Sequence, residues 1–270
     1  MPPATYTRLS TRRLKVATFN VNSIRRRLDT VVHWLTRHQP DILCLQETKV
    51  QDKDFPVETL AAAGYHARFR GMKGYNGVAV LSRTPPEQVT FGLGSSSNAD
   101  TDRFMRVVIH GITIINTYVP QGSSIRSPRY QYKLDWFARL REYFATHYSP
   151  HECIVWCGDM NVAPTPLDVY SPHTHLNHVC FHEAVREAYR RTVQWGFEDV
   201  FRRLHPNRQE YTFWDYRQPC AVRAHRGWRL DHILATRPLA IHCTASEVDL
   251  APRLGSLPSD HTIVWAMFSW

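Results

Sequence analysis

Two polar residues that can take part in catalysis stand directly behind a short apolar run. The run at 154–158 predicts a buried strand that ends at Gly158. Asp159 and Asn161 follow it, and a Pro-rich loop at 164–166 prevents regular structure from continuing. Ligands of α/β sheets bind at the carboxyl ends of the strands. We therefore expect a carboxylate and an amide, two residues apart, to face a ligand at this edge.

Polar groups occupy comparable positions elsewhere in the chain. The further candidates at predicted strand ends are Asn20, Asn22, Glu47, Tyr118, Asp231, Asp260 and His261. Oxygen donors in a chain with few accessible thiols favour a hard cation, Mg²⁺ or Mn²⁺. A carboxylate that activates water, with a cation and a histidine that offset negative charge, suits hydrolysis of a phosphodiester. The sequence contains no Walker loop, no Gly-x-Ser-x-Gly and no His-Glu-x-x-His, which would indicate other chemistries.

Each of these residues also has a purely structural interpretation. An Asp behind a strand is more often a turn former or a helix cap than a catalyst, by about four to one for a single case. Glu47 could pair with a surface lysine, and Asp231 could hold a loop through a salt bridge. Independent structural roles for the whole set are hard to sustain, because all of its members stand at predicted strand ends.

The first 50 residues predict a β-α-β unit. Strands are expected at 14–19 and 42–45, and the helix between them has the apolar face Leu28, Val31 and Leu35, with Ser23 as its cap. Consecutive strands joined by a helix are parallel. Asn20, Asn22 and Glu47 are therefore expected at one edge of neighbouring strands.

The remaining elements follow from the same patterns. Strands are expected at 65–70, 77–82 and 262–268, a hairpin at 103–110 and 112–118, and helices at 56–63, 127–147 and 183–194. A weak repetition of strand, helix, strand and hairpins favours two packed sheets. Because no linker interrupts the composition, we expect one domain at 14–270, preceded by a basic, solvated tail at 1–13.

Composition restricts the class of protein. The 270 residues are 43% hydrophobic, enough for one large core, and carry a net charge of +9. A basic surface favours an anionic partner, most economically nucleic acid, although solubility alone is an alternative. No apolar run approaches the roughly 20 residues of a membrane span. The six cysteines form no Cys-x-x-Cys pair, which disfavours a zinc ribbon and favours a reducing, cytoplasmic location.

The order of the motifs resembles one family. Asn20-x-Asn22, Gln46-Glu47-Thr48-Lys49, Tyr118-x-Pro120-Gln121-Gly122, Gly158-Asp159-Met160-Asn161, Trp228-Arg229-Leu230-Asp231 and Ser259-Asp260-His261 occur in the order of the exonuclease III family of abasic-site endonucleases. That family belongs to the endonuclease/exonuclease/phosphatase superfamily. The resemblance implies a four-layered α/β sandwich, in which two packed mixed β-sheets are flanked by helices.

The resemblance also implies roles for single residues. Glu47 resembles the main metal ligand, with Asp260 and Asn22 nearby. Asp159 resembles the group that activates the attacking water, which Asn161 orients. His261, paired with Asp231, resembles the stabiliser of a phosphate oxygen, while Tyr118 and Asn20 resemble phosphate-positioning groups. The implied enzyme is a Mg²⁺-dependent monomer, with Mn²⁺ as a substitute, which incises double-stranded DNA 5′ to abasic sites and trims 3′ ends, and which associates with the nucleoid through DNA.

Two further sets of residues bear on the substrate. Phe213, Trp228 and Leu230 match the family's apolar pocket for an extruded abasic sugar, which excludes a normal nucleotide by size. Without the resemblance, ordinary core packing would be the preferred interpretation of these three residues. The basic residues expected beside the strand ends, where they could contact DNA phosphates, are Arg25, Arg26, Lys49, Lys73, Arg103 and Arg126.

Some features depart from the family pattern, and two other functions stay open. Asn22 stands where some relatives carry Asp, which weakens one metal contact. The histidines at 173, 175, 178 and 182 match no compact metal site. The first alternative is hydrolysis of another phosphoester, such as a sphingomyelin or an inositol phosphate. The second is a DNA-binding module without catalysis.

Overall fold

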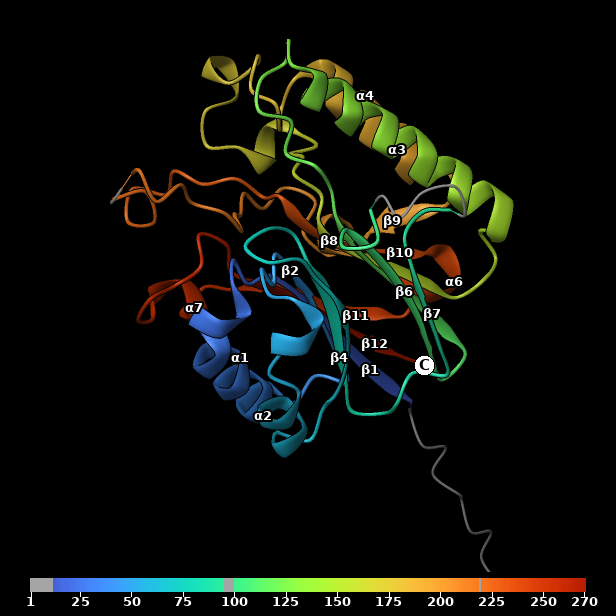
Figure 1. Ribbon diagram of the computed structural model, residues 1–270. Coiled ribbons are helices and arrows are strands. Elements are labelled where there is room, and N and C mark those ends of the chain that lie inside the picture. The colour runs from blue at the N-terminus through green and yellow to red at the C-terminus, as the bar shows by residue number, and fades with distance from the viewer. Residues whose placement is uncertain (1–11, 95–99, 219) are drawn as a thin grey trace, which may run out of the picture.

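Two six-stranded mixed sheets lie face to face (Figure 1). The computed structural model describes residues 12–94, 100–218 and 220–270. The first sheet has the order β11-β12-β1-β2-β4-β3 and the second β5-β6-β7-β8-β10-β9. The strands of the first sheet are β1 (Arg13–Asn20), β2 (Ile42–Gln46), β3 (His66–Arg70), β4 (Val78–Ser82), β11 (Cys243–Asp249) and β12 (Ile263–Ser269). Those of the second are β5 (Gln88–Phe91), β6 (Phe104–Ile109), β7 (Ile112–Tyr118), β8 (Ile154–Asp159), β9 (Phe197–Asp199) and β10 (Asp231–Thr236).

Helices cover the outer faces of both sheets. α1 (Ile24–His38) and α2 (Val57–Ala62) lie against the first sheet, and α3 (Pro128–His147) and α4 (Glu183–Val193) against the second (Figure 1). The short helices are α5 (Val200–Leu204), α6 (Arg237–Ala240) and α7 (Ala251–Leu254). Three 3₁₀ turns are η1 (Asp52–Asp54), η2 (Pro166–Asp168) and η3 (Pro172–Thr174). The expected four-layered α/β sandwich is confirmed.

Three apolar cores fill the spaces between the layers. Val80 and Ile233 belong to the core between the sheets, Trp136 to the core beneath α3 and α4, and Leu35 to the core beneath α1. Strands β2, β4, β8 and β10 are buried along their whole length because both of their faces contact a core. Among the described residues, no helix is both long and apolar enough to cross a membrane.

All strands and helices whose ranges the sequence predicts are present, but four strands had no predicted range: β5, β9, β11 and β10, which was indicated only by Asp231 as a strand end. β5 and β11 lie at sheet edges and leave most of their residues at least partly exposed, so they lack the apolar runs that indicated the other strands. β9 has only three residues. Residues 1–11 of the expected basic tail lie outside the described residues. The backbone of Arg12 forms hydrogen bonds with the backbone of Trp270.

Two local expectations were wrong. Strand β8 does not end at Gly158 but continues to Asp159, so the catalytic candidate is held by the sheet itself. Ser23 stands at the N-cap position of α1, but it has φ 88° and its side chain makes no cap hydrogen bond. The start of α1 is instead fixed by backbone bonds, from Ser23 N–H to the Glu47 carbonyl and from Ile24 N–H to the Thr48 carbonyl.

Strand register explains why the polar candidates meet. β1 and β2 are parallel with Asn20 opposite Gln46, and β7 and β8 are parallel with Tyr118 opposite Asp159. β10 runs antiparallel to β8 and begins at Asp231, opposite Asp159. The starts of antiparallel strands therefore lie at the same edge as the carboxyl ends of the parallel ones.

The close approach of β7 and β8 requires a glycine at position 158. Gly158 has φ +135°, and a Cβ atom there would lie 2.0 Å from the Thr117 carbonyl oxygen. We expect Gly158→Ala to lower the free energy of unfolding by roughly 3 kcal/mol or more, because the strands would have to separate. Gly64→Ala is the matched control, since Gly64 also has positive φ (+86°) but open space around it; its cost should be about 1 kcal/mol. Equal losses in denaturant unfolding would contradict this explanation.

Candidate active site

The side chain of Asn20 joins two carboxylates from different sheets. Its Nδ2 donates to Glu47 Oε1 at 2.8 Å and to Asp159 Oδ2 at 2.9 Å. Asn20 is fully buried at the end of β1, and Ser259 Oγ donates to its carbonyl oxygen at 2.8 Å. The amide therefore fixes the separation between the expected metal ligand and the expected water-activating group.

Asp159 is held from its own loop as well. The Asn161 backbone N–H donates to Asp159 Oδ1 at 2.9 Å, and Asn161 Nδ2 donates to Asp159 Oδ2 at 3.2 Å and to the Val119 carbonyl at 2.9 Å. Asn161 has φ 49°, so the chain turns sharply behind β8. These contacts make Asn161 a support for the carboxylate.

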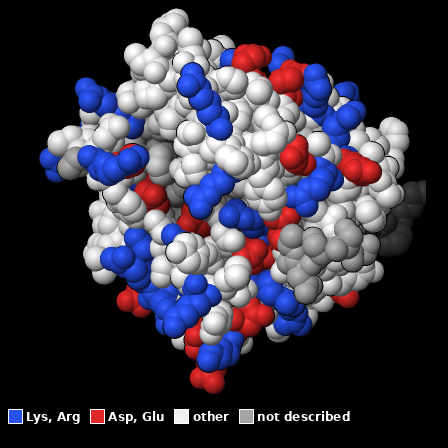
Figure 2. All heavy atoms as spheres, turned by 45° about the horizontal axis from the view of Figure 1, so that its top comes forward, with Lys and Arg blue, Asp and Glu red and all other residues white. Residues whose placement is uncertain are grey.

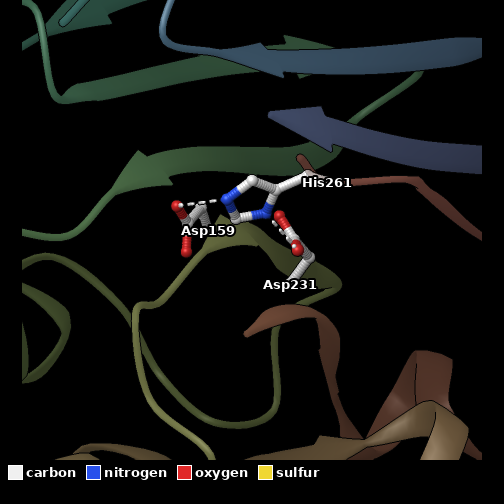
Figure 3. A group of neighbouring side chains, drawn as sticks. All are labelled: Asp159, Asp231 and His261. Atoms are coloured by element: carbon white, nitrogen blue, oxygen red, sulfur yellow. Dashed lines mark hydrogen bonds and ion pairs between the residues drawn. The ribbon is translucent and has the colours of Figure 1, made fainter. Parts of the chain in front are cut away.

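An aspartate and a histidine face Asp159 from the strand starts. His261 Nδ1 donates to Asp231 Oδ2 at 2.7 Å, and its Nε2 lies 3.8 Å from Asp159 Oδ2 (Figure 3). Thr212 Oγ1 also donates to Asp231 Oδ2, at 2.6 Å. The imidazole ring therefore stands between two carboxylates, and Asp231 and Thr212 fix its orientation.

Burial and neighbouring charges shift the pKa values of both Asp159 and His261. Burial raises the pKa of Asp159 to about 7, against the lowering effect of His261. Burial alone would lower the pKa of His261, but Asp231 and Asp159 outweigh it and raise that pKa to about 10. His261 is thus an imidazolium at neutral pH, while Asp159 changes charge near neutrality.

Glu47, Asn22 and Asp260 supply oxygen atoms on the other side of Asn20. Asn22 Nδ2 donates to Asp260 Oδ1 at 2.9 Å, and Lys49 Nζ contacts Glu47 Oε2 at 2.7 Å and Asn22 Oδ1 at 2.6 Å. Burial alone would raise the pKa of Glu47, but Lys49 and the hydrogen bond from Asn20 lower it overall, so this carboxylate is ionised. Two carboxylates and an amide oxygen suit a hard divalent cation.

A second group of potential ligands is less suited to a cation. Atoms of Asp159, Asp231 and His261 lie within 4.8 Å of one another. A metal-binding histidine must offer an unprotonated nitrogen, whereas His261 is protonated and donates to Asp231. The donor set of Glu47, Asn22 and Asp260 is therefore the better cation site.

Tyr118 borders the site at the end of β7. Burial and the neighbouring carboxylates Glu47 and Asp159 raise its pKa well above the usual value, so the hydroxyl stays protonated and can donate. Arg103 lies over the Tyr118 ring at 4.6 Å, and its Nη1 donates to the Tyr118 carbonyl at 3.2 Å. Arg103, expected to contact DNA, also supports the tyrosine.

Of the three expected pocket residues, Phe213 lies next to His261 and pairs with Trp228, and the set is not freely open. The ring of Phe213, which is partly exposed, lies 4.9 Å from that of His261. Trp228 and Leu230 are only 7% and 3% exposed. The exposed ring of His178 lies 4.5 Å from the Trp228 ring, tilted by 37° to it, and the His175 ring lies 4.9 Å away, so histidines of the segment 173–182 cover this wall.

The other expected DNA-contacting residues differ in exposure. Arg25 and Arg26 in the first turn of α1, Lys73 and Arg126 are exposed, while Lys49 is partly buried. On the face shown in Figure 2, many Lys and Arg side chains lie near Asp and Glu side chains, including close to the centre. Basic side chains beside acidic ones suit a surface that takes both a cation and a polyanion.

This arrangement has counterparts in known proteins. The model of the Endonuclease/Exonuclease/phosphatase family matches residues 17–261. The chain belongs to this family. It is 32% identical over 267 residues to exodeoxyribonuclease III of Haemophilus influenzae, covering 94% of this chain and 100% of the relative. The family resemblance inferred from the motifs is confirmed.

Solved structures of the family superpose closely on the chain. An AP endonuclease from Archaeoglobus fulgidus is 53% identical with a TM-score of 0.93, covering 94% of this chain and 99% of that one. A 3′ phosphatase from Neisseria bound to a product DNA hairpin is 35% identical with a TM-score of 0.89, covering 95% and 100%. The sandwich is thus shared by a protein named an AP endonuclease and one named a 3′ phosphatase.

Three residues of this family member support the site but were not among the sequence candidates. Thr212 holds Asp231 and stands in the segment 211–214, to which the sequence analysis assigned no catalytic role. Lys133 on α3 is fully buried, and its Nζ donates to the carbonyls of Gln121, Asn161 and Val179 at 2.7–3.0 Å. Arg229 Nε contacts Asp168 at 2.7 Å beneath the segment that leads to Asp231. Only Arg229 stands in a motif, so sequence pattern gave no other signal.

The protonation of His261 depends on Asp231. In Asp231→Asn, the pKa of His261 should fall by about one to three pH units, because its main stabilising charge is lost. The imidazole resonances in an NMR titration report this directly: the imidazolium persists to about pH 10 in the wild type and to lower pH in the variant. Asp249→Asn, which removes the carboxylate beside His38, is the control. Unchanged titration in Asp231→Asn would mean that another group holds this proton.

Proposed function

We propose that the protein is a Mg²⁺-dependent DNA-repair phosphodiesterase that incises double-stranded DNA 5′ to abasic sites and trims 3′ ends. The convergence of Glu47, Asp159 and His261 around Asn20 carries this proposal. The names of its relatives, exodeoxyribonuclease III and AP endonuclease, support the same chemistry.

The site residues divide the work of hydrolysis. Asp159, with a pKa of about 7, is suited to accept a proton from water near neutral pH. His261, an imidazolium, can donate a hydrogen bond to a phosphate oxygen as negative charge develops on it. The Tyr118 hydroxyl, which stays protonated, would orient the phosphate group at the same edge. Asn20 would act indirectly, because both N–H groups of its Nδ2 are donated to Glu47 and Asp159.

Glu47, Asn22 and Asp260 would hold the cation. A bound Mg²⁺, or Mn²⁺ in its place, would polarise a phosphate oxygen and offset the charge of the transition state. Within this set, Glu47 is held in the ionised form that binds a cation. Asn22 contributes a neutral oxygen, which makes the site less acidic than one built from three carboxylates.

Abasic specificity would come from the wall formed by Phe213, Trp228 and Leu230. A sugar without its base is small and apolar, and can enter where a complete nucleotide cannot. The basic residues Arg25, Arg26, Lys73 and Arg126 are exposed, as contacts to DNA phosphates require.

A second candidate function is 3′-end trimming without incision at abasic sites. The observation in its favour is His178, whose ring covers Trp228 where the extruded sugar would lie. Removal of a 3′-terminal group needs the phosphate chemistry but not that apolar wall. One relative that is named a 3′ phosphatase has the same fold.

The test is a gel assay on two end-labelled duplexes, one with a single abasic-site analogue and one intact with a recessed 3′ end, each with Mg²⁺ or EDTA. Metal-dependent incision together with trimming is the expected result. Trimming alone would favour the second candidate. No cleavage of either duplex would overturn the proposal and favour hydrolysis of a lipid or an inositol phosphate.

Asp159→Asn should lower cleavage of both duplexes by about 10²- to 10⁴-fold, the range for loss of a general base. Its folding and DNA affinity should stay near wild type, because an asparagine oxygen can still accept from Asn20. Single-turnover kinetics and a binding titration separate the two quantities. Turnover like the wild type would exclude Asp159 from the mechanism.

His178→Ala should raise the ratio of abasic incision to 3′ trimming, by roughly tenfold, because it uncovers the Trp228 wall. His173→Ala, at an exposed position of the same segment, is the matched control. The two rates are measured on the same pair of duplexes. A ratio that stays constant in His178→Ala would show that this ring does not limit access to the wall.

A further inference from the structure

The ammonium group of Lys49 lies among the oxygens expected to bind the cation. Its Nζ is 2.7 Å from Glu47 Oε2 and donates to Asn22 Oδ1 at 2.6 Å. Asn22 in turn donates to Asp260 Oδ1 at 2.9 Å. One lysine thus contacts two of the three expected ligands and reaches the third through Asn22.

The backbone around these groups is fixed, so the lysine side chain is the part that can move. Glu47 and Lys49 both adopt left-handed backbone angles, with φ 51° and 55°. Lys49 N–H donates to the Asn76 carbonyl at 2.9 Å, and Ser23 N–H to the Glu47 carbonyl at 2.7 Å. The Lys49 side chain is 27% exposed, so its flexible stem can turn outward without disturbing a core.

A divalent cation and this ammonium group would compete for the same oxygen atoms. Carboxylate and amide oxygens are ligands for hard cations, and each is also an acceptor for an ammonium. A cation on Glu47 Oε2 and Asn22 Oδ1 would in addition repel the positive nitrogen beside it. The repulsion disfavours occupancy of these oxygens by both charges at once.

We propose that Lys49 is an internal counter-ion of the cation site, which it occupies in the metal-free enzyme and leaves when a divalent cation binds. This inference rests on the proposed function, because it takes Glu47, Asn22 and Asp260 as the cation ligands. When the cation displaces Lys49, its ammonium group moves to the edge of the site, where it would form an ion pair with an anionic substrate. Lys49 therefore lowers the affinity for the cation in the absence of substrate and favours loading of cation and substrate together.

The test measures cation binding without DNA. Mn²⁺ is titrated into the full-length protein, and the free ion is followed by electron paramagnetic resonance at constant pH and ionic strength. Lys49→Met should tighten Mn²⁺ binding by roughly threefold to fivefold, the upper part of the range for removing a partly exposed ion pair. Lys73→Met, which removes an exposed lysine of the adjoining loop, controls for a general change of charge and should stay within about twofold of the wild type.

The outcomes distinguish a wrong role for Lys49 from a wrong choice of cation ligands. Unchanged or weaker Mn²⁺ binding in Lys49→Met, or equal tightening in Lys73→Met, overturns the role of Lys49. Glu47→Gln must weaken binding strongly if the site is correct. If it does not, the site and the inference fall together. Lys49→Gln repeats the test with a polar side chain of similar length, and a loss of tightening in that variant alone would show that its amide replaces the ammonium on the same oxygens.

Discussion

The geometry of the site depends on one amide group, Nδ2 of Asn20. It joins Glu47, at the end of the first sheet's β2, to Asp159, at the end of the second sheet's β8. The bond to Asp159 is buried and the bond to Glu47 is partly buried, and a buried donor or acceptor left without its partner costs about 1–3 kcal/mol. The cation side and the water-activating side of the site are therefore spaced by a side chain that belongs to neither.

The spacing between Glu47 and Asp159 is kept only if the two sheets do not shift relative to each other. A buried polar bridge in the middle of the apolar sandwich holds it: Asn116 Nδ2 on β7 donates to the carbonyls of Leu45 and Ala79 at 3.0 and 2.9 Å. Gln46 Nε2 donates back to Asn116 Oδ1 at 2.7 Å. Apolar contacts alone would allow the sheets to slide, whereas these bonds have one satisfied geometry.

The two sides of the site, which Asn20 separates, differ in charge. On one side His261 keeps a proton between Asp231 and Asp159, which suits contact with a phosphate oxygen. On the other side Glu47 stays ionised against Lys49. Buried cations behind the site, such as Lys133 on its three carbonyls, hold the loops that carry these groups. The reactive groups thus sit on strand ends and on loops that are tied down from beneath.

The sequence by itself determined the β-α-β start, the hairpin, the long helices and the residues at the strand ends, because apolar periodicity and motif order are local properties. It missed edge strands such as β11, whose exposed positions carry no apolar run, and Thr212, whose only signal is its contact with Asp231. Only the tertiary structure decided that Asp231 faces Asp159 across antiparallel strands and that His178 covers Trp228. Those contacts join segments far apart in the chain, and their geometry is set by sheet register and loop packing, which no local pattern encodes.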